Sequence, residues 1–188
     1  MNILPIDELN TFQNDISIHF ENGKMRSRED YEDILDELLD FFLLAYANGA
    51  QAANTDLGTD IKPTVSEAES AINEPVAGKT WRERVKEYYE SGGSEYDIAR
   101  IAETDMTRIY NTAVLDVARL NGDSNVKKRW NAVMDDRTRE THFFLDGVTI
   151  PLDAYFVSFD GDMALAPGMF TKAENVVNCR CAVELVRG

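Results

Sequence analysis

The residues best suited to chemistry lie near the C-terminal end, in the stretch NVVNCRCAVELV at positions 175–186. This stretch holds the only two cysteines of the chain, Cys179 and Cys181, with one residue between them. Cysteine thiolates act as metal ligands, nucleophiles or redox pairs, and each of these uses requires a suitable partner group. The chain has two histidines, His19 and His142, and only His142 lies in the C-terminal half. His142 is therefore the first candidate partner.

The spacing of the two cysteines limits what they can do together. The β-branched residues around them predict a strand, in which side chains alternate between two faces. Cys179 and Cys181 would then point one way, and Asn178 and Arg180 the other. The Cα atoms of the cysteines would be about 7 Å apart, at the upper end of disulfide geometry. A disulfide between them would be strained, so we expect both thiols to be reduced.

The cysteines and His142 permit a metal site, a nucleophilic pair or a structural cluster. A metal site needs more ligands than two thiolates and one imidazole, although a carboxylate such as Asp146 could complete the set. A nucleophilic pair of Cys179 and His142 lacks an identifiable group to orient the base or form an oxyanion hole. We therefore expect two buried thiols beside a hydrogen-bonded histidine, with no cofactor. A metal, if bound, would use His142, Cys179 and Cys181.

A second polar cluster, DDRTRETH at 135–142, lies next to His142. We expect a short helix here, in which Asp135 or Asp136 pairs with Arg139 three or four residues further on. Arg137 and Arg180 could join this helix to the sheet through buried carboxylates. We interpret these charges as structural, because they would fix a small β unit with a thin core.

The residues flanking this cluster predict a turn and an aromatic core. Asp146 and Gly147 form a turn into a strand, where glycine supplies backbone freedom. Aromatic side chains are expected to fill the space beneath the cluster, namely Trp130, Phe143, Phe144, Phe156 and Phe159.

Helices must position these groups, because the chain before Gly122 has helical periodicity. Apolar residues recur at three- and four-residue intervals over 29–54, and cap signals open helices near 64, 80 and 94. After Gly122 the segments become β-rich and are bounded by glycine and proline. The predicted class is α+β, a helical N-terminal part followed by a small C-terminal unit with an antiparallel β-sheet. We divide the chain into an acidic helical region, 1–76, and a domain at 77–188, in which a long helix at 94–120 precedes a small α+β unit at 123–188.

Charge restricts the partners of the protein. The formal charge is −15, and residues 1–76 carry 4 Lys+Arg against 16 Asp+Glu. The nearest basic cluster, NVKKRW at 125–130, holds three cations and is interpreted as a solvated face, so we expect no direct nucleic-acid binding. The sequence has no long apolar run and no positively charged, apolar leader, so we expect no membrane association and a cytoplasmic location.

Common catalytic signatures do not occur in the sequence. It has no glycine-rich phosphate loop, no His-Glu-x-x-His and no Gly-x-Ser-x-Gly motif. We therefore expect a protein that is not an enzyme. The alternative is a metal- or thiol-dependent enzyme that uses His142, Cys179 and Cys181.

Taken together in order, these motifs resemble the C-terminal signature of the phage Mu F-like minor head proteins, also called phage head morphogenesis proteins. The resemblance covers about residues 94–186. It begins with the helix IAETDMTRIYNTAVLDVARLNG and continues through WNAVMDDRTRETHFFLDG at 130–147 to AENVVNCRC at 173–181. The signature residues expected to have structural roles are Trp130, Asp135, Asp136, Arg137, Arg139, His142, Asp146, Gly147, Asn178, Cys179, Arg180 and Cys181.

The resemblance implies a structural virion component encoded by a phage or prophage. Such a protein would associate with phage portal or capsid proteins and act in head assembly or in DNA packaging and delivery. It would be found in the host cytoplasm during assembly and then in the virion head. The resemblance implies no established catalysis in this domain, although some relatives carry fused toxin domains. No residues follow the signature here, so we expect no C-terminal toxin.

Overall fold

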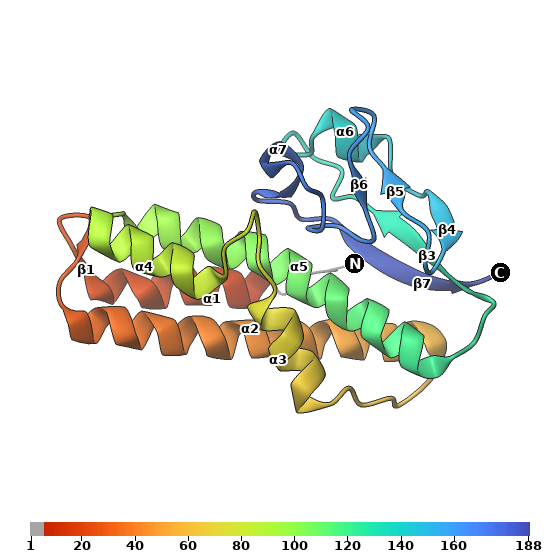
Figure 1. Ribbon diagram of the computed structural model, residues 1–188, viewed down its shortest axis with the longest axis horizontal. Coiled ribbons are helices and arrows are strands. Elements are labelled where there is room, and N and C mark those ends of the chain that lie inside the picture. The colour runs from red at the N-terminus through yellow and green to blue at the C-terminus, as the bar shows by residue number, and fades with distance from the viewer. Residues whose placement is uncertain (1–5) are drawn as a thin grey trace.

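The computed structural model describes residues 6–188, which form helices followed by a small β-containing unit (Figure 1). The helices are α1 (Ile6–Asp15), the 3-10 turn η1 (Ile16–His19), α2 (Arg28–Leu57), α3 (Val65–Asn73), α4 (Trp81–Ser91), α5 (Glu95–Asn121), α6 (Glu140–Phe143) and α7 (Ala173–Val176). The strands are β1 (Phe20–Glu21), β2 (Lys24–Met25), β3 (Val126–Asn131), β4 (Thr149–Pro151), β5 (Phe156–Val157), β6 (Met163–Ala164) and β7 (Ala182–Arg187). The α+β prediction is confirmed. Residues 1–5 of the predicted acidic region lie outside the described residues.

The helix ends follow the local signals of the sequence. Thr64 and Glu67 form a capping box at the start of α3, and Asp97 accepts a hydrogen bond of 2.9 Å from the backbone N–H of Ser94 at the start of α5. Gly92 and Gly122 end α4 and α5 in the left-handed conformation that glycine adopts without strain. The predicted long helices at 29–54 and 94–120 therefore correspond to α2 and α5, with small differences at their ends.

Helices α2 and α5 form the core of the helical body, which we define as α1–α5. They run side by side in the same direction (Figure 1). Leu38 and Phe42 of α2 and Ile109 of α5 are fully buried between the helices and their neighbours. At Gly49 a Cβ atom would lie 2.2 Å from the carbonyl oxygen of Tyr110. Glycine is thus required there, because the two backbones approach too closely for a side chain.

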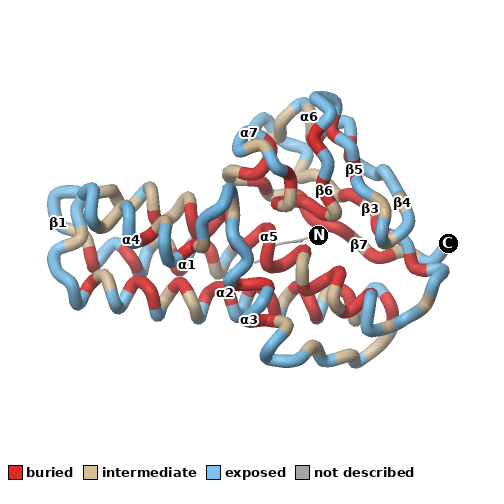
Figure 2. The backbone as a smooth tube through the Cα atoms, in the orientation of Figure 1, coloured by how far each residue is buried: buried red, intermediate tan, exposed pale blue. Residues whose placement is uncertain are grey.

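The C-terminal unit, residues 123–188, contains a three-stranded antiparallel sheet in the order β4-β3-β7. Strand β7 lies against α2 and α5, and Figure 2 shows buried residues concentrated along it. Its Leu185 N–H donates to Oδ2 of Asp56 at 2.9 Å, and Arg187 donates to the carbonyl oxygen of Leu57 at 2.9 Å. The last strand of the chain is therefore fixed to the end of α2.

The basic cluster at 125–130 lies in the central strand β3, and its interpretation as a solvated face holds for Lys127 but is wrong for Lys128. Strand alternation places Lys128 on the same buried face as Val126 and Trp130, and Lys128 is fully buried. Its Nζ donates to the carbonyl oxygen of Leu152 at 2.6 Å. The neighbouring Arg129 forms an ion pair of 2.5 Å with Glu184.

The helix expected over 135–142 is only the single turn α6, at Glu140–Phe143. The Asp135 carboxylate accepts a hydrogen bond of 3.0 Å from the backbone N–H of Arg137. A side chain that bonds its own neighbouring backbone in this way favours a turn over a helix. The expected pairing of Asp135 or Asp136 with Arg139 along a helix is therefore wrong, and Asp136 is exposed.

The aromatic core is smaller than expected. Trp130 and Phe156 are buried with their ring centroids 5.1 Å apart, as expected. Phe143, Phe144 and Phe159 are instead 54%, 62% and 77% exposed. They lie in the short helix α6 and in loops, where no regular alternation directs them inward.

No helix among residues 6–188 combines the length and apolar character needed to cross a membrane.

Candidate functional site

The structure brings His142, Cys179 and Cys181 into one buried cluster. Nδ1 of His142 lies 3.6 Å from Sγ of Cys179 and 3.5 Å from Sγ of Cys181. The three residues are 1%, 1% and 3% exposed, and both cysteines are free thiols. The residues predicted to cooperate from their types alone are therefore in direct contact.

The two cysteines precede strand β7, so the prediction that they lie within a strand is wrong. The chain turns at Asn178, which has a positive φ of 55°. The backbone carbonyls of Cys179 and Cys181 are bound by side chains of α5 and not by a neighbouring strand. Both sulfurs nevertheless point to the same side, where His142 lies.

Aromatic rings enclose the imidazole of His142. Trp130 meets it edge-on at a centroid distance of 5.4 Å, and Phe170 stacks on it at 5.6 Å. Nε2 of His142 is buried and has no hydrogen-bond partner among residues 6–188. All polar contact of the imidazole within the described chain is thus directed toward the two sulfurs.

The pKa values of the two thiols are shifted in opposite directions. A hydrogen bond from the Cys181 thiol holds the pKa of Cys179 well below its usual range, and His142 adds to this effect against the desolvation. The pKa of Cys181 is raised, first by its hydrogen bond to Cys179 and then by burial. Cys179 is therefore the more acidic of the two thiols.

Polar side chains of α5 hold the cysteine segment in place. Thr104 Oγ1 accepts a hydrogen bond of 3.2 Å from the N–H of Asn178, and Thr107 donates to the carbonyl oxygen of Cys179. Asn111 donates to the carbonyl oxygen of Cys181 at 3.2 Å and accepts from the N–H of Val183 at 2.8 Å. Sequence reasoning missed these three residues of α5. Their spacing of three and four places them on one face of the helix, and small polar residues within a buried helix indicate contacts with another segment.

Three arginines connect the loop around α6 to α5 and to the cysteine segment. Arg180 forms a two-pronged ion pair with Asp135 at 2.8 and 2.6 Å, and Arg139 donates to the carbonyl oxygen of Val177. Arg180 holds the pKa of Asp135 well below its usual range. Arg137 lies 3.5 Å from Glu103 of α5, whose pKa is raised by burial.

The turn at Asp146 and Gly147 also has a structural role. The Asp146 carboxylate accepts from the backbone N–H of Ala132 at 2.9 Å, and Gly147 donates to the carbonyl oxygen of Trp130 at 2.8 Å. Gly147 has a φ of 74°, which favours glycine. Asp146 is therefore engaged with the backbone after β3 and does not belong to the cluster of His142, Cys179 and Cys181.

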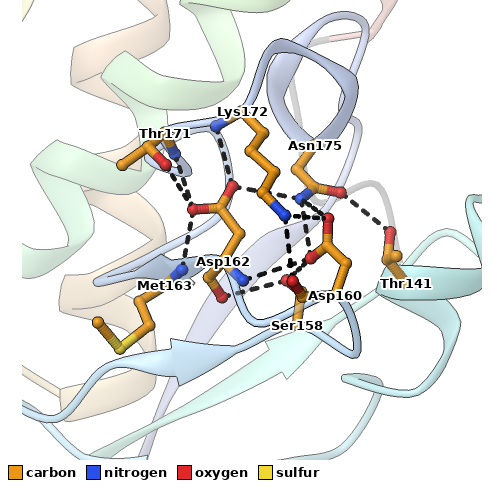
Figure 3. Close-up of polar contacts among 8 residues, drawn as sticks. All are labelled: Thr141, Ser158, Asp160, Asp162, Met163, Thr171, Lys172 and Asn175. Atoms are coloured by element: carbon orange, nitrogen blue, oxygen red, sulfur yellow. Dashed lines mark hydrogen bonds and ion pairs between the residues drawn. The ribbon is translucent and has the colours of Figure 1, made fainter.

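Sequence reasoning missed a second polar network, the polar clamp, which consists of Ser158, Asp160, Asp162, Thr171, Lys172 and Asn175 (Figure 3). Asp162 accepts hydrogen bonds from Thr171 Oγ1 at 2.7 Å and from the N–H of Lys172 at 2.9 Å. Burial raises the pKa of Asp162, but these hydrogen bonds outweigh it and lower the value to about 2. Lys172 Nζ lies 3.0 Å from Asp160, so this lysine contacts Asp162 through its backbone and Asp160 through its ammonium group.

Asn175 connects the clamp to α6. Its amide group donates to Asp160 at 3.1 Å and accepts from Thr141 at 3.2 Å, next to His142 in the chain (Figure 3). The clamp thus fixes two loops and the helical turn that carries His142.

The segments that form the long helix, the small sheet and the buried histidine–cysteine cluster match a known protein family in sequence. The profile described as Phage Mu protein F like protein matches residues 66–184, more than half of the chain. The chain therefore belongs to the phage Mu F-like minor head protein family, and the resemblance stated from its motifs is confirmed.

Two curated relatives match parts of the chain. Minor head protein GP7 of Bacillus phage SPP1 is 44% identical over 59 residues, which are 31% of this chain and 19% of that protein. NAD(+)--arginine ADP-ribosyltransferase EFV of Enterococcus faecalis is 31% identical over 151 residues, which are 62% of this chain and 31% of that protein. The chain thus spans a third or less of the length of these relatives. No solved structure matches the chain.

Proposed function

We propose that this protein is a structural minor head protein that docks on phage portal or capsid proteins. In this role it acts in head assembly or in DNA packaging and delivery, first in the host cytoplasm and then in the virion head. Membership of the Mu F-like family supports the structural role. The relative from phage SPP1, which is named a minor head protein, supports it further.

The exposed aromatic cluster of Phe143, Phe144 and Phe159 is the observation that supports docking most directly. The ring centroids of Phe143 and Phe144 are 6.0 Å apart, and those of Phe144 and Phe159 are 6.4 Å apart. All three rings are more than half exposed. Large aromatic side chains are favoured at the centres of protein interfaces because they bury much area with little loss of rotamer freedom. This cluster is the proposed contact with a head protein.

The experiment replaces Phe144 and Phe159 together by serine and measures co-sedimentation with procapsids of the same phage and capture by its portal protein. We expect binding to fall at least tenfold, because interface aromatics often contribute more than about 1.4 kcal/mol each. The matched control is Tyr96→Ser, since Tyr96 is 66% exposed on α5, outside the cluster. Unchanged binding of the double variant, or absence of binding by the wild type, would contradict the proposal.

The protein is proposed to bind no DNA by itself. Its charge of −15 repels phosphate, and the basic cluster offers little to oppose this. Lys128 is buried and Arg129 is paired with Glu184, so among residues 6–188 Lys127 is the one cation of those three without such a constraint. A gel-shift assay at low salt, where electrostatic binding is strongest, tests this claim. Micromolar affinity for duplex DNA would contradict it.

Enzymatic activity is not part of the proposal. The three residues named for a thiol- or metal-dependent enzyme are at most 3% exposed, so a substrate has no direct access to the sulfurs in this conformation. The transferase named among the relatives shares with this chain only 31% of its own length. Its activity is therefore not transferred to this chain.

A further inference from the structure

His142, Cys179 and Cys181 form a site with the dimensions of a zinc centre. In a tetrahedral zinc site with bonds of about 2.3 Å to sulfur and 2.0–2.1 Å to nitrogen, the nitrogen and each sulfur are separated by roughly 3.6 Å. The observed separations from Nδ1 are 3.6 Å to Cys179 and 3.5 Å to Cys181. All three ligand atoms lie within 4.8 Å of one another. A single ion could therefore contact all three ligand atoms.

Hydrogen bonding accounts less well than a metal ion for the nearly equal distances from His142 Nδ1 to the two sulfurs. Nδ1 of an imidazole has either one N–H or one lone pair, so it makes one good hydrogen bond. Here it has two sulfurs at nearly equal distance. A metal ion placed between the three atoms satisfies the nitrogen and both sulfurs at once.

Contacts with α5 hold the cysteine segment in place. Thr107 donates to the carbonyl oxygen of Cys179, and Asn111 donates to that of Cys181. The site is thus pre-arranged by contacts that do not involve the ligand atoms.

We propose that this protein binds one Zn²⁺ ion through Nδ1 of His142 and the thiolates of Cys179 and Cys181. The sequence alone favoured a metal-free cluster, because a Cys-x-Cys pair with one histidine is a weak signature. The group contains no fourth His, Cys, Asp or Glu ligand from residues 6–188, so a buried water molecule completes the tetrahedron. The ion links α6 to the segment before β7 and so cross-links two parts of the C-terminal unit. Helix α6 carries both His142 and Phe143 of the proposed docking surface, but zinc content and docking are measured separately, so either proposal can fail without the other.

The test measures zinc in the full chain, purified with a reducing agent and without chelators or metal-affinity resin. We expect one zinc per chain by mass spectrometry of the metal. Zinc should be lost in Cys179→Ser and His142→Asn and kept in His19→Asn, which changes the other histidine of the chain. Removal of the metal with a mercurial and chelator should lower the Tm, and Zn²⁺ but not Mg²⁺ should restore it.

A second measurement covers the case in which the variants fail to fold. Wild-type protein reconstituted with Co²⁺ should have the intense d–d bands of a tetrahedral site and thiolate-to-cobalt charge-transfer absorption. Substoichiometric zinc in the purified wild type, together with no uptake of Zn²⁺ or Co²⁺ by the reduced, folded protein, would overturn the proposal. Full zinc content in folded Cys179→Ser would also overturn it.

Discussion

The helical body and the C-terminal unit are stabilised in different ways. In the helical body, apolar stripes on α2 and α5 pack into a continuous core. In the C-terminal unit, short strands and single helical turns are joined by buried polar contacts, such as those of Asn111, Asp162 and Lys128. A thin unit of this kind buries little apolar area for each residue, so individual hydrogen bonds matter more.

The first prediction concerns the apolar core of the helical body. Leu38→Asp should destabilise the whole protein by about 3–5 kcal/mol, because it places an unpaired charge where Leu38 is fully buried. The control is Leu44→Asp on the same helix, where Leu44 is 41% exposed and a change below about 1 kcal/mol is expected. Urea unfolding measures both. Equal effects of the two variants would contradict the packing of α2 described here.

The second prediction concerns the polar support of the C-terminal unit. Asn111→Ala should cost roughly 2–4 kcal/mol, because it leaves the N–H of Val183 and the carbonyl of Cys181 without partners in a buried position. Thr112→Ala is the control, since Thr112 bonds only within its own helix.

Each region contains one buried tryptophan, Trp81 in the helical body and Trp130 in the C-terminal unit. Replacing either by phenylalanine leaves the other as a fluorescent probe of its own region. With Asn111→Ala, the Trp130 signal should change at lower urea than the Trp81 signal. Coincident transitions at an unchanged midpoint would show that the C-terminal unit does not depend on Asn111.

The third prediction concerns Lys128 and pH. Burial lowers the pKa of Lys128 to about 8, whereas an unfolded lysine has a pKa of about 10.4. Between these values the unfolded chain binds the additional proton, so the free energy of unfolding should rise with pH across this window. Below pH 8 the penalty for burying the charge is fully present.

Lys128→Met should therefore stabilise the protein at pH 7 by roughly 1–2 kcal/mol and remove this part of the pH dependence. Lys127→Met on the exposed face of the same strand should do neither. Titrations of the cysteines occur in all three proteins and cancel in the difference. A wild-type stability that does not rise relative to Lys128→Met between pH 8 and 10 would contradict the assignment.

The smallest expected effect is that of an exposed aromatic residue of the C-terminal unit, compared with a buried one. Phe144→Ser should change the free energy of unfolding by less than about 0.5 kcal/mol, because the ring is mostly exposed. Phe156→Ser, which alters the buried ring against Trp130, is the contrasting variant and should cost about 3 kcal/mol or more. A large effect of Phe144→Ser on urea unfolding would place this ring in the core.

Local signals in the sequence determined the helical body. Periodic apolar residues, capping boxes and terminal glycines act over a few residues, so the positions of α2, α3, α4 and α5 follow from neighbours in the chain. The ordered motifs also determined the family. The same reasoning failed at 135–139, where the Asp135 side chain bonds the nearby backbone and prevents a helix.

Only the tertiary structure decided the contacts of the C-terminal unit, because they join residues far apart in sequence. Asn111 meets Val183, and His142 meets Cys179 and Cys181, through folding of the chain around α5. Lys128 is buried because its face of the sheet packs against the rest of the protein, and the sequence around Lys127, Lys128 and Arg129 does not indicate which face that is. Residue types suggested that the histidine and the cysteines could cooperate. The nearly equal distances from His142 to the two sulfurs, and the burial of all three residues, arise from packing against α5, Trp130 and Phe170.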